Sequence, residues 1–317
     1  MRPFFGYHMP NYTFHDTADT DLFDRVVELA QAAERAGFDM VTVMDHFYQI
    51  GVVGLEEEPM LEGYAVLSAL AMRTNRVLLG TMVSGVTYRN PAMLAKTVTT
   101  LDVISRGRAV LGIGAAWNES EHAGYGFDFP PIGRREDRLE EALTIARAMF
   151  DEERPSFEGT YYRIDRALNR PRPIQPGGPK ILVGGAGEKR TLKLAARFAD
   201  MTNWFGTLED AAPKLAVLDR HCEAVGRDPA KILRTVSVPI VLADGERDKA
   251  AVLAAIPAAR RGAVVAATVP EGAEMLHRYM DAGFGGFIFR NATTRTPEAV
   301  ARVGELIQTI RSKEGAA

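Results

Sequence analysis

Eight short apolar runs, separated by amphipathic stretches, repeat along nearly the whole chain. Most of them are apolar throughout rather than at alternate positions, which is typical of strands buried on both faces. The predicted strands are Phe4 to His8, Met40 to Asp45, Val77 to Val83, Ala109 to Gly114, Lys180 to Gly184, Asp200 to Trp204, Leu233 to Leu242 and Gly286 to Phe289. Strands that alternate with helices form a parallel sheet, and eight of them predict a closed (β/α)8 TIM barrel of the α/β class.

Helical spacing fills the stretches between the runs. Leu22, Val26, Leu29 and Ala33 recur at helical intervals, and Gly37 ends that helix. Another helix begins at Pro91, where proline suits a first turn. Further helices are predicted over residues 134–150, 188–198, 208–225, 271–282 and 297–312.

Two segments interrupt the alternation of strands and helices. Residues 151–179 hold five prolines and a short aromatic piece, and they are interpreted as an insertion before strand five. Residues 243–270 form an Ala-rich insertion between strands seven and eight. Neither insertion is long enough for a domain of its own, so we expect residues 1–317 to form a single domain.

Composition and charge narrow the function classes. Hydrophobic residues make up 46% and charged residues 25% of the 317 positions, and the net charge is -3 without a run of like charges, which argues against a nucleic-acid partner. The chain has neither a signal-peptide core nor ~18 consecutive apolar residues for a membrane span. We therefore expect a cytoplasmic protein without a membrane partner. Cys222 has no second cysteine with which to pair.

Chemistry in a TIM barrel lies where strands end and the following loops begin. The second predicted strand ends in VTVMDHF, which places Asp45 and His46 at this rim. His46 has two interpretations at this position: a hydrogen-bonded rim histidine, or an acid or base whose pKa lies near the working pH.

Small residues gather at the ends of strands three to five. Gly80 and Gly85 flank the end of strand three and indicate either a backbone that approaches a flat ligand or a β-bulge. Strand four ends in LGIGAAWNESEH, where Gly112, Gly114, Ala115 and Ala116 leave room at the rim, and Trp117 and Asn118 offer a stacking face and an amide.

The loop after strand five reads GGAGEKRTLK and runs into a helix, so its free N–H groups suit an anion. A structural turn would show the same glycines, and the loop matches neither a P-loop nor the GxGxxG fingerprint. No motif for a metal site or for a catalytic nucleophile occurs in the chain, and no metal is expected.

Together these stretches resemble the bacterial luciferase-like oxidoreductases, and most closely the branch that uses the deazaflavin coenzyme F420. The resemblance runs from about Phe4 to Ile310 and is carried by MDHF, EEPMLE, TYRNPAMLAKTVTTLDVISRGRAVLGIGAAWNESEH, EERPSFEGTYY and GGAGEKRTL. In some members a glutamate occupies the position of Trp117, so the acid or base of those members, with their sugar-phosphate substrate, is not carried over.

The resemblance implies a role for each rim segment. Asp45 and His46 would face the cofactor, with His46 as proton donor or acceptor and Asp45 orienting the site. A non-prolyl cis peptide at Met82-Val83, near Gly85, would support the deazaflavin ring. The ring and ribityl chain would contact Ala115, Ala116, Trp117 and Asn118, and the phosphate and anionic tail would contact Gly184, Gly185, Ala186, Gly187, Glu188, Lys189, Arg190 and Thr191.

The function expected from this resemblance is an F420-dependent oxidoreductase that moves a hydride between the deazaflavin and a small organic substrate. Two alternatives stay open: an FMN-dependent luciferase-like monooxygenase, and a non-catalytic carrier that binds F420. The resemblance also implies a homodimer. The substrate and the direction of hydride transfer do not follow from the sequence.

Overall fold

Eight parallel strands close into a barrel in the computed structural model, which describes residues 2–14, 16–238, 240–254, 256, 261, 264–290 and 295–314. In spatial order from β3 the ring passes through β2, β1, β13, β10, β9, β8 and β5, and pairing of β3 with β5 closes it. The strands are β1 (Phe4–Met9), β2 (Met40–Val43), β3 (Leu78–Thr81), β5 (Ala109–Gly114), β8 (Lys180–Gly184), β9 (Met201–Phe205), β10 (Leu233–Val238) and β13 (Gly286–Arg290). The predicted TIM barrel is confirmed.

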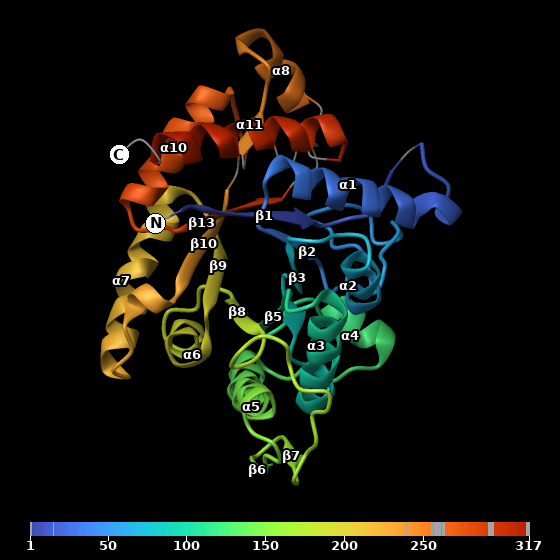
Figure 1. Ribbon diagram of the computed structural model, residues 1–317, viewed down its shortest axis with the longest axis vertical. Coiled ribbons are helices and arrows are strands. Elements are labelled where there is room, and N and C mark those ends of the chain that lie inside the picture. The colour runs from blue at the N-terminus through green and yellow to red at the C-terminus, as the bar shows by residue number, and fades with distance from the viewer. Residues whose placement is uncertain are drawn as a thin grey trace.

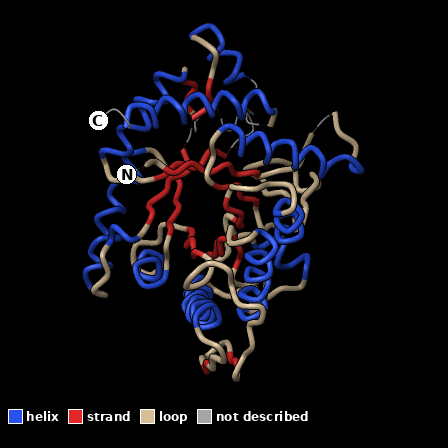
Figure 2. The backbone as a smooth tube through the Cα atoms, in the orientation of Figure 1, coloured by secondary structure: helices blue, strands red, loops and turns tan. Residues whose placement is uncertain are grey.

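Helices surround this ring of strands on the outside (Figures 1 and 2). They are α1 (Leu22–Ala36), α2 (Gly63–Ala71), α3 (Pro91–Ser105), α4 (Glu119–Tyr125), α5 (Ile132–Asp151), α6 (Thr191–Phe198), α7 (Leu208–Ala224), α10 (Val269–Asp281) and α11 (Pro297–Glu314). Gly37 ends α1 in the left-handed region, and Asn90 caps α3 just before Pro91. None of the described helices is long and apolar enough to cross a membrane.

Three predicted boundaries near the rim were wrong. Strand two ends at Val43 rather than Asp45: the bond from the Met82 amide to the Val43 carbonyl is the last of its ladder with the β3 segment, and the chain bends at residues 47–48. Strand three ends at Thr81; a cis peptide joins Met82 to Val83, as expected, and the short strand β4 (Ser84–Gly85) pairs with β5. Helix α6 begins three residues later than its predicted start, because residues 188–190 form a turn.

Both expected insertions carry structure of their own. The first contains an antiparallel pair, β6 (Phe157–Glu158) and β7 (Arg163–Ile164). The second contains α8 (Glu246–Ala254) and β12 (Val265–Ala267), which pairs with β11 (Ile240–Leu242). The predicted seventh strand, 233–242, was therefore too long, since its last residues belong to this small separate sheet. Figure 1 shows α8 projecting beyond α11 and β6–β7 projecting beyond α5.

Apolar side chains fill the barrel near the amino ends of the strands. Met40, Val110, Leu182 and Met201 form a buried cluster there, against which Val83 packs. Side chains on alternate residues of a barrel strand point inward, so this end is a packed core. Chemistry in this fold lies at the carboxyl ends of the strands, and the interior below that rim is closed.

The glycines of the barrel strands are explained by the protein's own packing. A Cβ at Gly112 would lie 1.9 Å from the Thr81 carbonyl oxygen. Those at Gly114 and Gly184 would lie 3.0 and 2.8 Å from the nearest Val83 methyl carbons. The expectation that Gly112 and Gly114 leave open room was wrong, because the Thr81 carbonyl and the Val83 side chain occupy that space.

We predict that Gly112→Ala lowers the free energy of unfolding by about 3 kcal/mol, the upper range for overpacking a core, because its Cβ would collide with main chain that cannot rotate away. Gly51→Ala is the matched control, since a Cβ there meets nothing within 4 Å. Denaturant unfolding of both variants measures the difference. Equal stabilities would contradict this account of the barrel packing.

Candidate active site

Asp45 lies buried at the rim and forms a two-armed ion pair with Arg89, the residue before the Asn90 cap of α3. Arg89 Nη2 lies 2.9 Å from Asp45 Oδ1, and Nη1 lies 2.5 Å from Oδ2. The Asp45 side chain is 1% exposed and that of Arg89 is 18% exposed. Asp45 therefore fixes the start of α3 against the end of β2.

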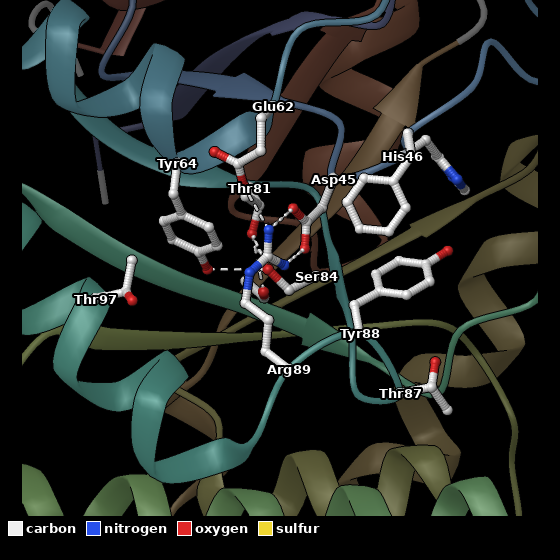
Figure 3. A network of polar contacts seen from close by, with 12 residues as sticks. Asp45, His46, Glu62, Tyr64, Thr81, Ser84, Thr87, Tyr88, Arg89 and Thr97 are labelled. Atoms are coloured by element: carbon white, nitrogen blue, oxygen red, sulfur yellow. Dashed lines mark hydrogen bonds and ion pairs between the residues drawn. The ribbon is translucent and has the colours of Figure 1, made fainter. Parts of the chain in front are cut away.

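Further polar groups extend this ion pair into a network, which Figure 3 shows from close by. Arg89 Nη2 also donates to Glu62, 2.5 Å away, while its guanidinium lies 5.0 Å from the centre of the Tyr64 ring. The Tyr64 hydroxyl lies 2.9 Å from Ser84 Oγ, which is the same distance from Thr81 Oγ1. The network thus joins α2 to the segment around the cis peptide.

For each member of the ion pair, burial and the charge of the partner shift the pKa in opposite directions. Burial raises the pKa of the Asp45 carboxyl above its ordinary value, against the attraction of Arg89. For Arg89, burial alone would lower the pKa, but the Asp45 and Glu62 carboxylates outweigh it and raise the pKa of the guanidinium. Asp45 is therefore an anchor for a cation, a role that the sequence did not indicate.

His46 points away from this network (Figure 3) and pairs instead with Glu121 on α4. The hydrogen bond joins His46 Nδ1 to Glu121 Oε1. The imidazole and the Trp117 ring meet edge to face with their centroids 5.5 Å apart. Its side chain is 14% exposed. One ring nitrogen is thus occupied by protein, and Nε2 is the atom left for a ligand.

Glu121 is the main site residue that sequence reasoning missed. Its side chain is fully buried, and it accepts from the Tyr88 hydroxyl at 2.5 Å and from the Phe47 amide at 2.8 Å. Burial would raise the pKa of this carboxyl, but the hydrogen bonds from His46, Tyr88 and Phe47 lower it below its ordinary value. The signal was present in WNESEH, where an acid three residues after Asn118 falls in the first turn of α4.

Two other histidines lie near this end of the barrel. His122 has both nitrogens engaged, Nε2 by Thr87 at 2.6 Å and Nδ1 by the Asn118 carbonyl at 2.6 Å. His8, near the end of β1, is buried and lies 2.9 Å from Thr42 Oγ1. His122 therefore has a structural position, whereas His8 is a second rim histidine that the sequence analysis did not single out.

The loop after β5 holds a strained backbone. Ala116 has a φ of 60°, in the left-handed region of the backbone that residues other than glycine rarely adopt. Arg135 of α5 is buried and donates to the Ala116 carbonyl at 2.8 Å. Trp117, next in the chain, is 57% exposed. The protein thus holds Ala115 to Asn118 in a defined shape and leaves an aromatic face accessible beside His46.

The loop after β8 offers main-chain donors. Within the described ranges, the amides of residues 186–191 have no hydrogen-bond acceptor from the protein, and a helix N-terminus follows them, as an anion site requires. Lys189 is exposed. Arg190, in contrast, pairs with Asp137 and donates to the Gly133 carbonyl at 3.1 Å. A contact between Arg190 and an anion would have to compete with these partners.

Val83 brings the predicted segments together, since its side chain touches the positions of Gly114 and Gly184 at the ends of β5 and β8. The Met82-Val83 peptide, the loop Ala115 to Asn118 and the loop Gly185 to Thr191 therefore share one side of the rim. Asp45 and His46 enter from β2 beside them. Among the described side chains, no group of three His, Cys, Asp or Glu residues could hold a metal ion.

A known protein family matches nearly the whole chain. The family model described as luciferase-like monooxygenase matches residues 5–311. The chain belongs to this family. Among its relatives, an F420-dependent glucose-6-phosphate dehydrogenase of Kineococcus radiotolerans is 34% identical over 225 residues, covering 68% of this chain and 63% of the relative. An F420-dependent hydroxymycolic acid dehydrogenase of Mycobacterium tuberculosis is 33% identical over 240 residues, covering 73% of this chain and 62% of the relative.

The luciferase-like fold is also found in solved structures. An F420-dependent secondary alcohol dehydrogenase, in complex with an F420-acetone adduct, superimposes with a TM-score of 0.81 at 19% identity, and the match covers 98% of this chain and 99% of the other. At this identity the likeness shows the fold alone. The chain spans slightly less than two thirds of the length of the curated relatives it matches.

Proposed function

We propose that this luciferase-like protein is a coenzyme F420-dependent oxidoreductase that moves a hydride between the deazaflavin and a small organic substrate. The observation that carries the proposal is the row of unengaged amides at residues 186–191, which suits an anionic tail. The F420-dependent relatives support the same coenzyme. An FMN-dependent monooxygenase and a non-catalytic F420 carrier are the outcomes that the tests below distinguish from it.

The residues around the rim fit such a coenzyme. In this proposal the peptide Met82-Val83 and the loop Ala115 to Asn118 hold the ring, and Gly184 to Thr191 hold the phosphate and tail. The bound deazaflavin supplies a carbon that donates or accepts hydride. The chain aligns substrate and coenzyme, excludes water, and handles one proton at His46 Nε2, the nitrogen that Glu121 leaves available.

The proposal extends to assembly and location. We propose a homodimer of single-domain subunits, residues 1–317 each, in the cytoplasm, with no nucleic-acid partner. A mass measured by light scattering tests the dimer. The sugar phosphate of the Kineococcus relative is not proposed as the substrate.

We predict that F420 binds far more tightly than FMN, because the loop after β8 suits a tail with more charge than a single phosphate. Added salt should weaken F420 binding. Lys189→Ala should weaken it further, whereas Lys180→Ala, the same charge change at the amino end of β8, should not. Titration of the wild type and both variants with each coenzyme, at two salt concentrations, measures the coenzyme preference, the salt effect and the effect of each lysine. Equal or tighter binding of FMN at low salt contradicts the assignment.

We predict that His46→Asn lowers turnover by ~10² to 10⁴, the usual worth of a positioned acid or base, while F420 affinity changes much less. His277→Asn is the control, because His277 lies on the outer helix α10. Turnover is followed at the coenzyme absorbance across a panel of reducible and oxidisable substrates. If His8→Asn abolished turnover and His46→Asn did not, the proton would pass at β1 instead.

A further inference from the structure

The contact between Glu121 and His46 fixes where the imidazole carries its proton. The Tyr88 hydroxyl and the amides of Phe47 and Tyr48 donate to Glu121 whatever the state of His46, and such hydrogen bonds lower the pKa of this carboxyl and favour its ionised form. An ionised carboxylate can only accept hydrogen bonds. His46 must therefore donate from Nδ1, and its Nε2 either holds a lone pair, in the neutral ring, or a second proton.

We propose that Glu121 is the positioning residue for His46: it holds the imidazole by Nδ1 so that Nε2 faces the reacting groups in the required tautomer and orientation. The inference rests on the proposed function, because it assigns His46 the proton of that reaction. Glu121 acts through His46 and has no contact with substrate in this proposal.

One carboxylate oxygen of Glu121 accepts hydrogen bonds from side chains, and the other accepts them from main-chain amides. Oε1 accepts from His46 and from the Tyr88 hydroxyl, whereas Oε2 accepts from the amides of Phe47 and Tyr48, at 2.8 and 3.4 Å. Since Phe47 and Tyr48 directly follow His46, one carboxylate orients both the imidazole and the main chain that carries it. A neutral residue could fill this space but could not satisfy all of these donors.

The surroundings keep Glu121 in place and keep water away. The Phe47 and Tyr88 rings pack against one another with centroids 4.9 Å apart. His122, the residue after Glu121, is buried, and its ring nitrogens hydrogen-bond Thr87 and the Asn118 carbonyl, which holds α4 in place. The carboxylate is thus supported from the segment after β4 and from its own helix, as a residue that orients another requires.

The direct test is the protonation of the His46 ring in the coenzyme-free protein, read from the ¹⁵N chemical shifts of labelled histidine. We expect a proton on Nδ1 in the wild type, and a changed pattern for His46 in Glu121→Gln. Tyr88→Phe is the matched control, because it removes a different donor to the same oxygen and leaves the imidazole contact. A wild-type ring without a proton on Nδ1, or an unchanged ring in Glu121→Gln, overturns the proposal.

Kinetics supply the second readout. Glu121→Gln preserves the shape but presents an NH2 group to one pair of donors, so we expect kcat to fall about 10²-fold or more, with F420 affinity within about twofold. Glu119→Gln makes the same change at an exposed position in the first turn of α4 and should stay near wild type, whereas Glu121→Asp, which keeps the charge, should recover part of the loss. Equal losses in Glu121→Gln and Glu119→Gln would contradict the positioning role.

The shift measurement also covers the case in which a variant fails to fold, since the wild type alone tests the assigned proton. It needs no coenzyme or substrate. A protein that shows the expected ring but neither binds F420 nor turns over would therefore contradict the proposed function while leaving the positioning contact intact.

Discussion

The packing of Val83 against glycines is the constraint on which the rim depends. A Cβ atom added at Gly114 or Gly184 would lie 3.0 or 2.8 Å from the nearest Val83 methyl carbon, too close for either to be accommodated without a shift. The Thr81 carbonyl in the same way fills the space beside Gly112. Close-packed interiors leave no slack at such points. Because Val83, two residues after the end of β3, touches the ends of both β5 and β8, the loops that follow these strands are held in a fixed relation.

Charge then divides the rim into two separate networks that start from neighbouring residues. Asp45 faces a guanidinium, and His46 faces a carboxylate, Glu121. Buried charges persist in proteins when they are paired and hydrogen-bonded, and both carboxylates satisfy this condition. The first network joins α2, β4 and the start of α3, while the second joins the β2 loop to α4. The same dipeptide therefore fixes the start of α3 through Asp45 and, in our proposal, handles the proton through His46.

The sequence predicted the barrel because eight apolar runs, each separated from the next by a stretch long enough for a helix, leave few other topologies. It located the cis peptide and the three rim segments through the family resemblance. It missed Glu121, His8 and the Arg89 partner of Asp45, since contacts between residues 34 to 75 positions apart depend on the closed ring and not on local pattern. It also misread Gly112 and Gly114, because a glycine that admits a ligand and one that admits a neighbouring carbonyl are identical in sequence.

We propose above all that the segments joined by Val83 form the binding site of the deazaflavin ring. The most direct measurement is a crystal structure of the protein with F420. The account predicts the ring against the Met82-Val83 peptide and the loop Ala115 to Asn118, with His46 Nε2 toward the reacting face and the tail along residues 185–191. A coenzyme bound away from these segments, or a tail leaving toward the acidic residues 56–58, would contradict it.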